Sequence, residues 1–175
     1  MVPWESVGKP CPDLAISCHN AIPLARGMGS SAAAIVGGMV ASNHLLGKPL
    51  SDKQVLSLAA QMEGHPDNVT PALLGGVQIV VDHQGSIVAS PVRISEEIKV
   101  VLFIPDRVIS TAAARRALPD TVPRKDAIYN LGRVALLVNA LNSDRMSDLG
   151  IAMEDKLHQP YRNSLLPAMS ILIRE

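Results

Sequence analysis

The chain has 175 residues, of which 47% are hydrophobic and 18% are charged, and its sixteen basic and sixteen acidic side chains cancel to a formal net charge of zero. This composition predicts a globular chain and excludes a disordered one, and the neutral charge balance argues against binding to nucleic acid or to an anionic membrane surface. One Trp, two Tyr and one Phe are too few for a base-stacking platform. The expected partner is therefore a small molecule.

The cysteines and the apolar runs bear on where the protein works. Cys11 and Cys18 are the only cysteines, a sparse pair that is typical of reduced thiols rather than of a disulfide framework. No apolar run approaches the ~20 residues of a membrane span, and the first residues, MVPWESVG, lack the basic and apolar regions of a signal peptide. We expect a cytoplasmic protein.

The hydrophobic pattern predicts a mixture of short strands and helices. A short buried strand is expected at 14–18, followed by a glycine-rich turn and an apolar, buried helix at 32–46. Ser51 and Gln54 form a capping-box signature for a second helix that Gly64 would end. The remaining predicted elements are strands at 77–81, 86–92 and 98–104, the last of them fully buried, and helices at 111–117, 125–141, 145–157 and from Pro167.

The glycine- and serine-rich turn, IPLARGMGSSAAA from Ile22 to Ala34, is the first candidate site. Gly27 and Gly29 permit a positive φ, and Ser30 and Ser31 fall at the expected helix start, where unpaired amides favour an anion such as phosphate. The serine hydroxyls are also suitable ligands for Mg²⁺. The alternative is a start of small residues needed only for close packing.

Two familiar nucleotide loops do not fit this turn. No lysine follows the glycines as a Walker A loop requires, because Arg26 precedes them. Gly27 and Gly29 also lack the third glycine of the dinucleotide-binding pattern.

The second candidate site is EGHPDN, from Glu63 to Asn68. On a structural interpretation Glu63 is solvated at a helix end and Asp67 or Asn68 caps the next short helix. On a functional one Glu63 is a second magnesium ligand, and His65, Asp67 and Asn68 line a pocket for a polar acceptor.

Basic residues form the third set, in STAAARRALPD and in HQPYR further on. Arginine binds carboxylates through two parallel hydrogen bonds, which makes Arg115 and Arg162 candidates for a carboxylate ligand. Taken alone, Arg115, Arg116 and Arg162 would more often be surface residues than ligands.

Four motifs, IPLARGMGSSAA, MEGHPDNVTPALLGG, STAAARRALPD and EDKLHQPYR, follow one another in this order. Together they closely resemble homoserine kinases of the GHMP kinase superfamily, over about residues 16–175. The first motif alone would indicate only the superfamily, which includes mevalonate, galactose and phosphomevalonate kinases.

The resemblance implies an α+β fold with two domains, incomplete at both ends. Residues 1–95 would form part of the ATP-binding N-terminal domain, which is ribosomal S5 domain 2-like, and residues 96–175 part of the ferredoxin-like α/β C-terminal domain. The boundary falls at the polar stretch 94–97. Strands before the glycine loop and a later glycine-rich motif of the family are expected to be missing.

The resemblance also implies a reaction, the transfer of the γ-phosphoryl group of ATP to the side-chain hydroxyl of L-homoserine, with Mg²⁺ as cofactor. The product would be O-phospho-L-homoserine, an intermediate of threonine biosynthesis, and a homodimer is one expected assembly. The alternatives are another GHMP small-molecule kinase of the mevalonate type, and a catalytically incomplete chain that only binds nucleotide.

Site residues carry over from the same motifs. The residues implied at the ATP phosphates are Pro23, Arg26, Gly27, Met28, Gly29, Ser30, Ser31 and Ala32. Those implied at the metal are Ser30, Ser31 and Glu63. Those implied at the substrate are His65, Asp67 and Asn68, with Asp67 suited to its ammonium group, and Arg115 and Arg162 at its carboxylate. Asp67, Asn68 and Thr111 are the residues implied closest to the chemistry, and the catalytic base is left open.

Overall fold

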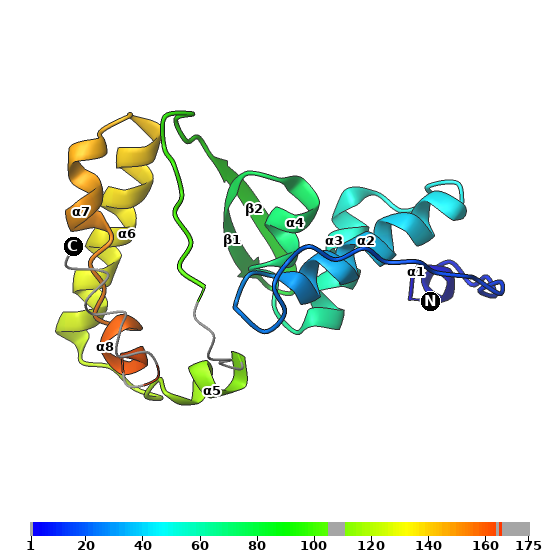
Figure 1. Ribbon diagram of the computed structural model, residues 1–175, viewed down its shortest axis with the longest axis horizontal. Helices are drawn as coiled ribbons and strands as arrows, with labels where there is room; N and C mark the ends of the chain where they lie inside the picture. The colour runs from blue at the N-terminus through cyan, green and yellow to red at the C-terminus, as the bar shows by residue number, and fades with distance from the viewer. Residues whose placement is uncertain (1, 105–110, 164, 166–175) are drawn as a thin grey trace. The chain divides into compact units, whose positions relative to one another are not determined.

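The protein is described by a computed structural model that covers residues 2–104, 111–163 and 165. The chain divides into two compact units. Unit 1 comprises Met1–Leu24 and Met28–Pro91, and unit 2 comprises Ala25–Gly27 and Val92–Glu175. The helices and strands of both units are labelled in Figure 1. The domain boundary expected between residues 95 and 96 stays a prediction.

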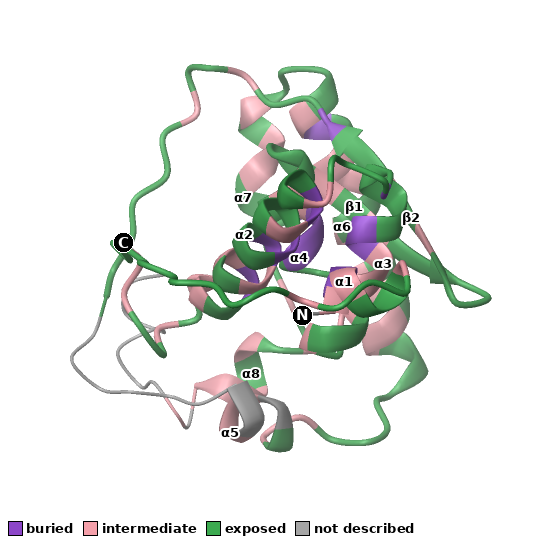
Figure 2. Ribbon diagram, turned by 90° about the vertical axis from the view of Figure 1, so that its right-hand side faces the viewer, coloured by how far each residue is buried: buried purple, intermediate pink, exposed green. Residues whose placement is uncertain are grey.

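Unit 1 is built around a small group of helices. They are α1 (Val2–Ser6), α2 (Ser30–Leu45), α3 (Asp52–Glu63) and α4 (Val69–Leu74). Helix α2 packs against each of the other three, and the buried residues between them are coloured purple in Figure 2. This core consists of Ala32, Val36, Met39, Leu50, Val55, Leu56, Ala59 and Val69.

The connections of these helices follow from their sequence. Ser51 and Gln54 form the expected capping box at the start of α3, and Gly64 ends that helix with a φ of 86°. Between α2 and α3 the buried Asn43 side chain donates to the carbonyl of Leu50 at 2.8 Å and accepts from its amide at 3.0 Å. The predicted helix at 51–64 is confirmed.

A hairpin follows α4 in unit 1. Its strands are β1 (Val77–His83) and β2 (Ser86–Val92), paired as a two-stranded sheet. Gln84 and Gly85 take φ values of 52° and 76° in the turn, and the Gly85 amide donates to Asp82 Oδ1 at 3.0 Å. Two positive φ values match the twist of paired strands. Both strands are predicted correctly apart from two residues at the end of β1.

Two other predicted strands are wrong. Segments 14–18 and 98–104 have no strand structure, and within them Ile16 and Val100 are each 79% exposed. A buried strand needs a neighbour to satisfy its backbone amides and carbonyls. In the described part of the chain the one sheet is the β1–β2 pair, which neither segment joins. Hydrophobic composition alone therefore overpredicted strands here.

Helix α2 differs from its prediction in burial. It begins at Ser30, where the two serines were expected to start it, but it buries only Ala32, Val36, Met39 and Asn43. Val40 and Leu45 are 45% and 59% exposed. The helix is apolar on most faces, but only one of them has other helices packed against it.

Unit 2 contains helices connected by polar segments. Its elements are α5 (Thr111–Arg116), α6 (Arg124–Asn142), the 3-10 helix η1 (Met146–Asp148), α7 (Leu149–Ala152) and α8 (Gln159–Arg162). Helix α6 packs against η1 and α7. The helices expected at 111–117 and 125–141 are present. In place of the one expected at 145–157, the chain forms η1 and the short α7, which ends at Ala152. The helix expected from Pro167 lies outside the described residues.

None of the helices in the described segments has the length and apolar character that a bilayer crossing requires.

Candidate active site

The backbone of the glycine loop has the conformation expected for anion binding. Ala25, Gly27 and Gly29 take φ values of 56°, 71° and 74°, whereas Arg26 and Met28 between them do not have positive φ. Alternation of this kind turns successive amides toward one side and forms an anion-binding concavity. A Cβ added at Gly27 or Gly29 would meet nothing within 4 Å. Glycine is therefore required here for its φ, and the space beside the loop is open.

The first turn of α2 adds unpaired donors to this loop. The amide of Ala33 donates to the carbonyl of Gly29 at 2.9 Å, so the amides of Ser30, Ser31 and Ala32 have no acceptor within the helix. Gly29 precedes them and has no side chain with which to cap them. The start of this 16-residue helix carries a partial positive charge. Backbone and helix together favour a phosphate group.

The close-packing alternative accounts for only part of this turn. Ala32 is 1% exposed and belongs to the core, so a small residue is required at its position. Ser31 is exposed, and close packing does not explain its hydroxyl group.

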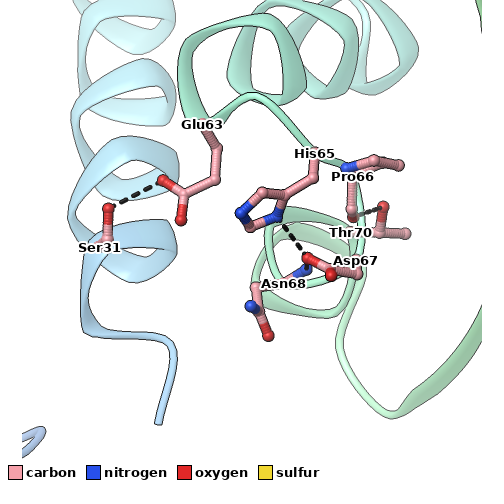
Figure 3. Close-up of polar contacts among 7 residues, drawn as sticks. All are labelled: Ser31, Glu63, His65, Pro66, Asp67, Asn68 and Thr70. Atoms are coloured by element: carbon pink, nitrogen blue, oxygen red, sulfur yellow. Dashed lines mark hydrogen bonds and ion pairs between the residues drawn. The ribbon is translucent and has the colours of Figure 1, made fainter. Parts of the chain in front are cut away.

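The central contact of the site joins two of the sequence motifs. The Ser31 hydroxyl, in the first turn of α2, donates to Glu63 Oε2 at 2.8 Å, and Figure 3 shows the two side chains pointing toward one another. Glu63 is the last residue of α3, and the left-handed Gly64 turns the chain away after it. The structure thus brings together the hydroxyl and the carboxylate that were predicted as magnesium ligands.

The chemistry of this pair fits Mg²⁺. Its oxygens are hard ligands, and Mg²⁺ is usually held by one or two carboxylates, with phosphates and waters completing the octahedron. Among the described residues there is no cluster of three or more His, Cys, Asp or Glu side chains able to hold a metal ion. A metal here would depend on a nucleotide for most of its ligands.

Asn20 is a site residue that the sequence reasoning missed. Its side chain accepts from the Ile22 amide at 3.0 Å and donates to the Ile22 carbonyl at 3.0 Å and to Ser30 Oγ at 3.3 Å. It therefore connects the segment before the loop to the helix after it. An asparagine two residues before an Ile-Pro pair is a turn signal that could have identified it.

The EGHPDN segment forms the connection between α3 and α4. His65 Nδ1 lies 2.6 Å from Asp67 Oδ1, which also accepts from the Asn68 amide at 2.7 Å. Asp67 is 63% exposed and His65 20%. Asp67 accepts from the amide of Asn68, the N-cap residue of α4, but no side-chain capping bond is present at this helix start, so the structural interpretation is not confirmed for Asp67 or Asn68. It is wrong for Glu63, which is bonded to Ser31 and not merely solvated.

The remaining candidates are distributed between loop and helices. Pro23, Arg26 and Met28 are half-buried loop residues. Asn68 is the N-cap of α4, although its exposed side chain makes no capping hydrogen bond. Thr111 and Arg115 belong to α5.

Arg162, the last residue of α8, is half-buried. Its Nε atom is shielded from water and has no hydrogen-bond partner in the segments that the structure describes. A donor that is shielded from water usually has a hydrogen-bond acceptor, which a ligand could supply here.

Comparison with known proteins finds a matching family model and similar sequences. Residues 4–76 match the family described as GHMP kinases N terminal domain. A homoserine kinase of Desulfitobacterium hafniense is 46% identical over 166 residues, covering 95% of this chain and 56% of the relative. The chain is related to the homoserine kinases of the GHMP superfamily. A homoserine kinase of a Picosynechococcus species is also 46% identical, with 93% and 53% of the two chains covered.

Solved structures of homoserine kinases have the same fold over the matched part of the chain. Homoserine kinase from Cytophaga hutchinsonii superposes with a TM-score of 0.74 at 28% identity, covering 87% of this chain and 50% of that one. A putative homoserine kinase from Listeria monocytogenes gives 0.63 at 30%, with the same coverage. The expected α+β GHMP kinase fold is therefore correct. The chain spans about half the length of the curated homoserine kinases it matches.

Proposed function

We propose that this chain carries out, as a homoserine kinase, the ATP-dependent phosphorylation of the L-homoserine side-chain hydroxyl to O-phospho-L-homoserine, a step of threonine biosynthesis. The observation that carries the proposal is the contact between Ser31 and Glu63, 2.8 Å apart, at the open end of α2. It joins the phosphate loop to the EGHPDN segment, and homology to homoserine kinases at 43–46% identity supports the assignment.

The glycine loop would bind the ATP phosphates. The left-handed Gly27 and Gly29 leave space for a bulky anion, and the amides of Ser30, Ser31 and Ala32 are unpaired within the helix. These donors are held in place before the nucleotide arrives. They can stabilise charge on the phosphates without reorganising.

Ser31 and Glu63, with Ser30, would hold Mg²⁺, which when bound supplies charge neutralisation at the phosphates. To ligate the ion, the Ser31 hydroxyl would offer it a lone pair, and the O–H that now points at the Glu63 carboxylate would turn aside, so that their present hydrogen bond would open. Asn20 would keep Ser30 oriented through its 3.3 Å hydrogen bond.

The substrate is a zwitterion, which requires one acidic partner and one or two basic partners in order to be bound without buried unpaired charge. Asp67 would take its ammonium group, and Arg115 and Arg162 its carboxylate. His65 and Asn68 would border the same subsite. His65, 2.6 Å from Asp67, would fix the orientation of that carboxylate.

Catalysis would rest mainly on positioning and on charge neutralisation, as in other phosphoryl transfers. Asn68 and Thr111 would lie beside the transferred phosphoryl group. Asp67 already accepts from His65 and from the Asn68 amide. A carboxylate that is also paired with the substrate ammonium is poorly suited to accept the hydroxyl proton, so we assign no catalytic base.

The domain division also belongs to this proposal, with the ATP-binding domain in residues 1–95 and the second domain in 96–175. A cytoplasmic location and a homodimer accompany it as predictions.

The decisive experiment incubates the chain with ATP, Mg²⁺ and L-homoserine and measures O-phospho-L-homoserine by mass spectrometry, with Glu63→Gln as the inactive comparison. Mevalonate, which has a carboxylate but no ammonium group, is offered in parallel. Product from L-homoserine alone supports the proposal. Product from mevalonate alone would instead indicate a GHMP kinase of the mevalonate type. A chain that binds nucleotide but forms neither product would be a nucleotide-binding protein without kinase activity.

A further inference from the structure

A polar network in unit 2 holds the segment that leads into α8. Asp155 Oδ1 accepts from Asn130 Nδ2 at 2.6 Å and from the Leu157 amide at 3.0 Å. Its Oδ2 accepts from the His158 amide at 2.7 Å and from the Gln159 amide at 2.5 Å. One carboxylate thus receives four hydrogen bonds, three of them from the backbone at the start of α8.

Helix α6 holds this segment at a second point. Asn130, from the middle of α6, donates to Asp155 and also accepts from the Lys156 amide at 2.9 Å through its Oδ1. Next to it, Glu154 accepts from the Tyr129 hydroxyl and, at 2.9 Å, from Arg133. The path of the chain from α7 to α8 is therefore set by side chains of α6.

The charge on Asp155 is part of this arrangement. Partial burial acts to raise the pKa of Asp155, but the hydrogen bonds from Asn130 and from the amides of Gln159, Leu157 and His158 outweigh it and lower that pKa from 3.8 to about 2. The carboxylate is thus ionised at neutral pH, when all four donors point at it.

Helix α8 is short, and Gln159 Nε2 also joins it to the end of α7 by donating to the Met153 carbonyl at 3.3 Å. It is four residues long, and its N-cap, His158, makes no side-chain capping bond. Helices this short are not stable by themselves in water. Its last residue is Arg162, whose amide donates to the His158 carbonyl at 3.0 Å and whose shielded Nε has no partner within the described segments.

We propose that Asp155 and Asn130 are positioning residues that fix α8 so that the Arg162 guanidinium is presented to the substrate carboxylate. This inference rests on the proposed function. Neither residue touches the substrate. They act through the backbone of α8.

The test uses L-homoserine and L-homoserinol, which lacks the carboxylate, as ligands of the full chain in calorimetric titrations with Mg²⁺ and a non-hydrolysable ATP analogue present. Asp155→Asn replaces one carboxylate oxygen by an NH₂ group. This group would face N–H donors from the backbone or from Asn130 and could not accept their hydrogen bonds. We expect the substitution to weaken L-homoserine binding about tenfold, as for the loss of one charge-assisted hydrogen bond, while L-homoserinol binding changes less than about twofold. General unfolding would weaken both ligands alike.

Two further variants sharpen this test. The double exchange Asp155→Asn with Asn130→Asp restores an acceptor opposite the amide donor, and it is expected to recover much of the lost L-homoserine affinity. Asp148→Asn removes a carboxylate of the same unit that pairs with Arg145 at 2.8 Å and is not part of the network, and it is expected to leave both affinities unchanged.

The outcomes separate the inference from the proposed function. If the unmodified chain prefers L-homoserine and Asp155→Asn keeps that preference in full, the positioning role is wrong and the proposed function stands. If the unmodified chain binds neither ligand, the proposed function fails, and the assignment to the substrate carboxylate fails with it. Hydrogen exchange at the amides of Leu157, His158 and Gln159 reports on the network directly. Unchanged protection of these amides in Asp155→Asn would overturn the positioning role of Asp155.

Discussion

The two units hold their candidate site residues by different means. In unit 1, Ser31 directly precedes the buried Ala32, and Asn68 directly precedes Val69 and Thr70, which are each 0% exposed. In unit 2 the buried apolar residues, among those described, are Val92, Ala140 and Ala152. There α8 is held by the side chains of Asp155 and Asn130. Packing fixes the first turn of α2, and polar bonds fix the segment that leads into α8.

Shortening a core side chain should give the largest effect. Leu56 is 4% exposed and Leu131, on α6, is 71% exposed. Leu56→Ala should lower the free energy of unfolding by about 3 kcal/mol, because it removes apolar contacts and leaves a cavity. Leu131→Ala should change it by less than about 0.5 kcal/mol. Urea unfolding curves measure both, and similar losses for the two variants would contradict the packing described for unit 1.

Replacing Gly29 or Gly37 by alanine should change the stability of the chain in opposite directions. Gly29→Ala forces a side chain into a φ of 74° and should cost about 1 kcal/mol, with weaker ATP binding, although a Cβ there meets no neighbour. Gly37→Ala lies inside α2 without positive φ and should stabilise by about 0.5 to 1 kcal/mol. Thermal unfolding checks the signs, and a stabilising Gly29→Ala would refute the left-handed loop.

The stability that the polar network contributes should decrease at acidic pH. Since the pKa of Asp155 is about 2 in the folded chain and 3.8 is its ordinary value, its contribution to stability is complete above about pH 4 and is lost as the pH falls through about 2. Allowing for screening by solvent, that contribution is on the order of 1 kcal/mol.

Asp155→Asn should therefore be less stable than the unmodified chain at pH 6, and the two should converge near pH 2. Chemical unfolding midpoints across this range provide the measurement, with Asp148→Asn as the matched control. Parallel curves at every pH would show that the Asp155 charge does not stabilise unit 2.

The sequence predicted local features better than it predicted burial. The capping box at Ser51, the left-handed Gly64 and the hairpin turn at Gly85 depend on neighbouring residues, and all three are present. The strands at 14–18 and 98–104 are absent, because a strand depends on a partner elsewhere in the chain, which composition cannot supply. A turn signal marks Asn20, but the sequence pattern could not reveal its contact with Ser30 or the contact of Asp155 with Asn130, because both depend on how distant segments pack.

For the site, motif order predicted which residues to consider and the structure showed which of them meet. Ser31 and Glu63 lie 32 residues apart in sequence and come into contact because α2 and α3 pack side by side. The substrate set of Asp67, Arg115 and Arg162 remains a prediction.

The most direct test of the account is whether Mg²⁺-dependent ATP binding requires Glu63. Calorimetric titration of ATP with and without Mg²⁺ should show tighter binding with the metal for the unmodified chain. Glu63→Gln should lose this gain, about tenfold in affinity for one charge-assisted interaction. Glu97→Gln, an exposed carboxylate outside the site, should retain it. Equal Mg²⁺ dependence in Glu63→Gln and in the unmodified chain would contradict the assignment of Ser31 and Glu63 as the metal and phosphate site.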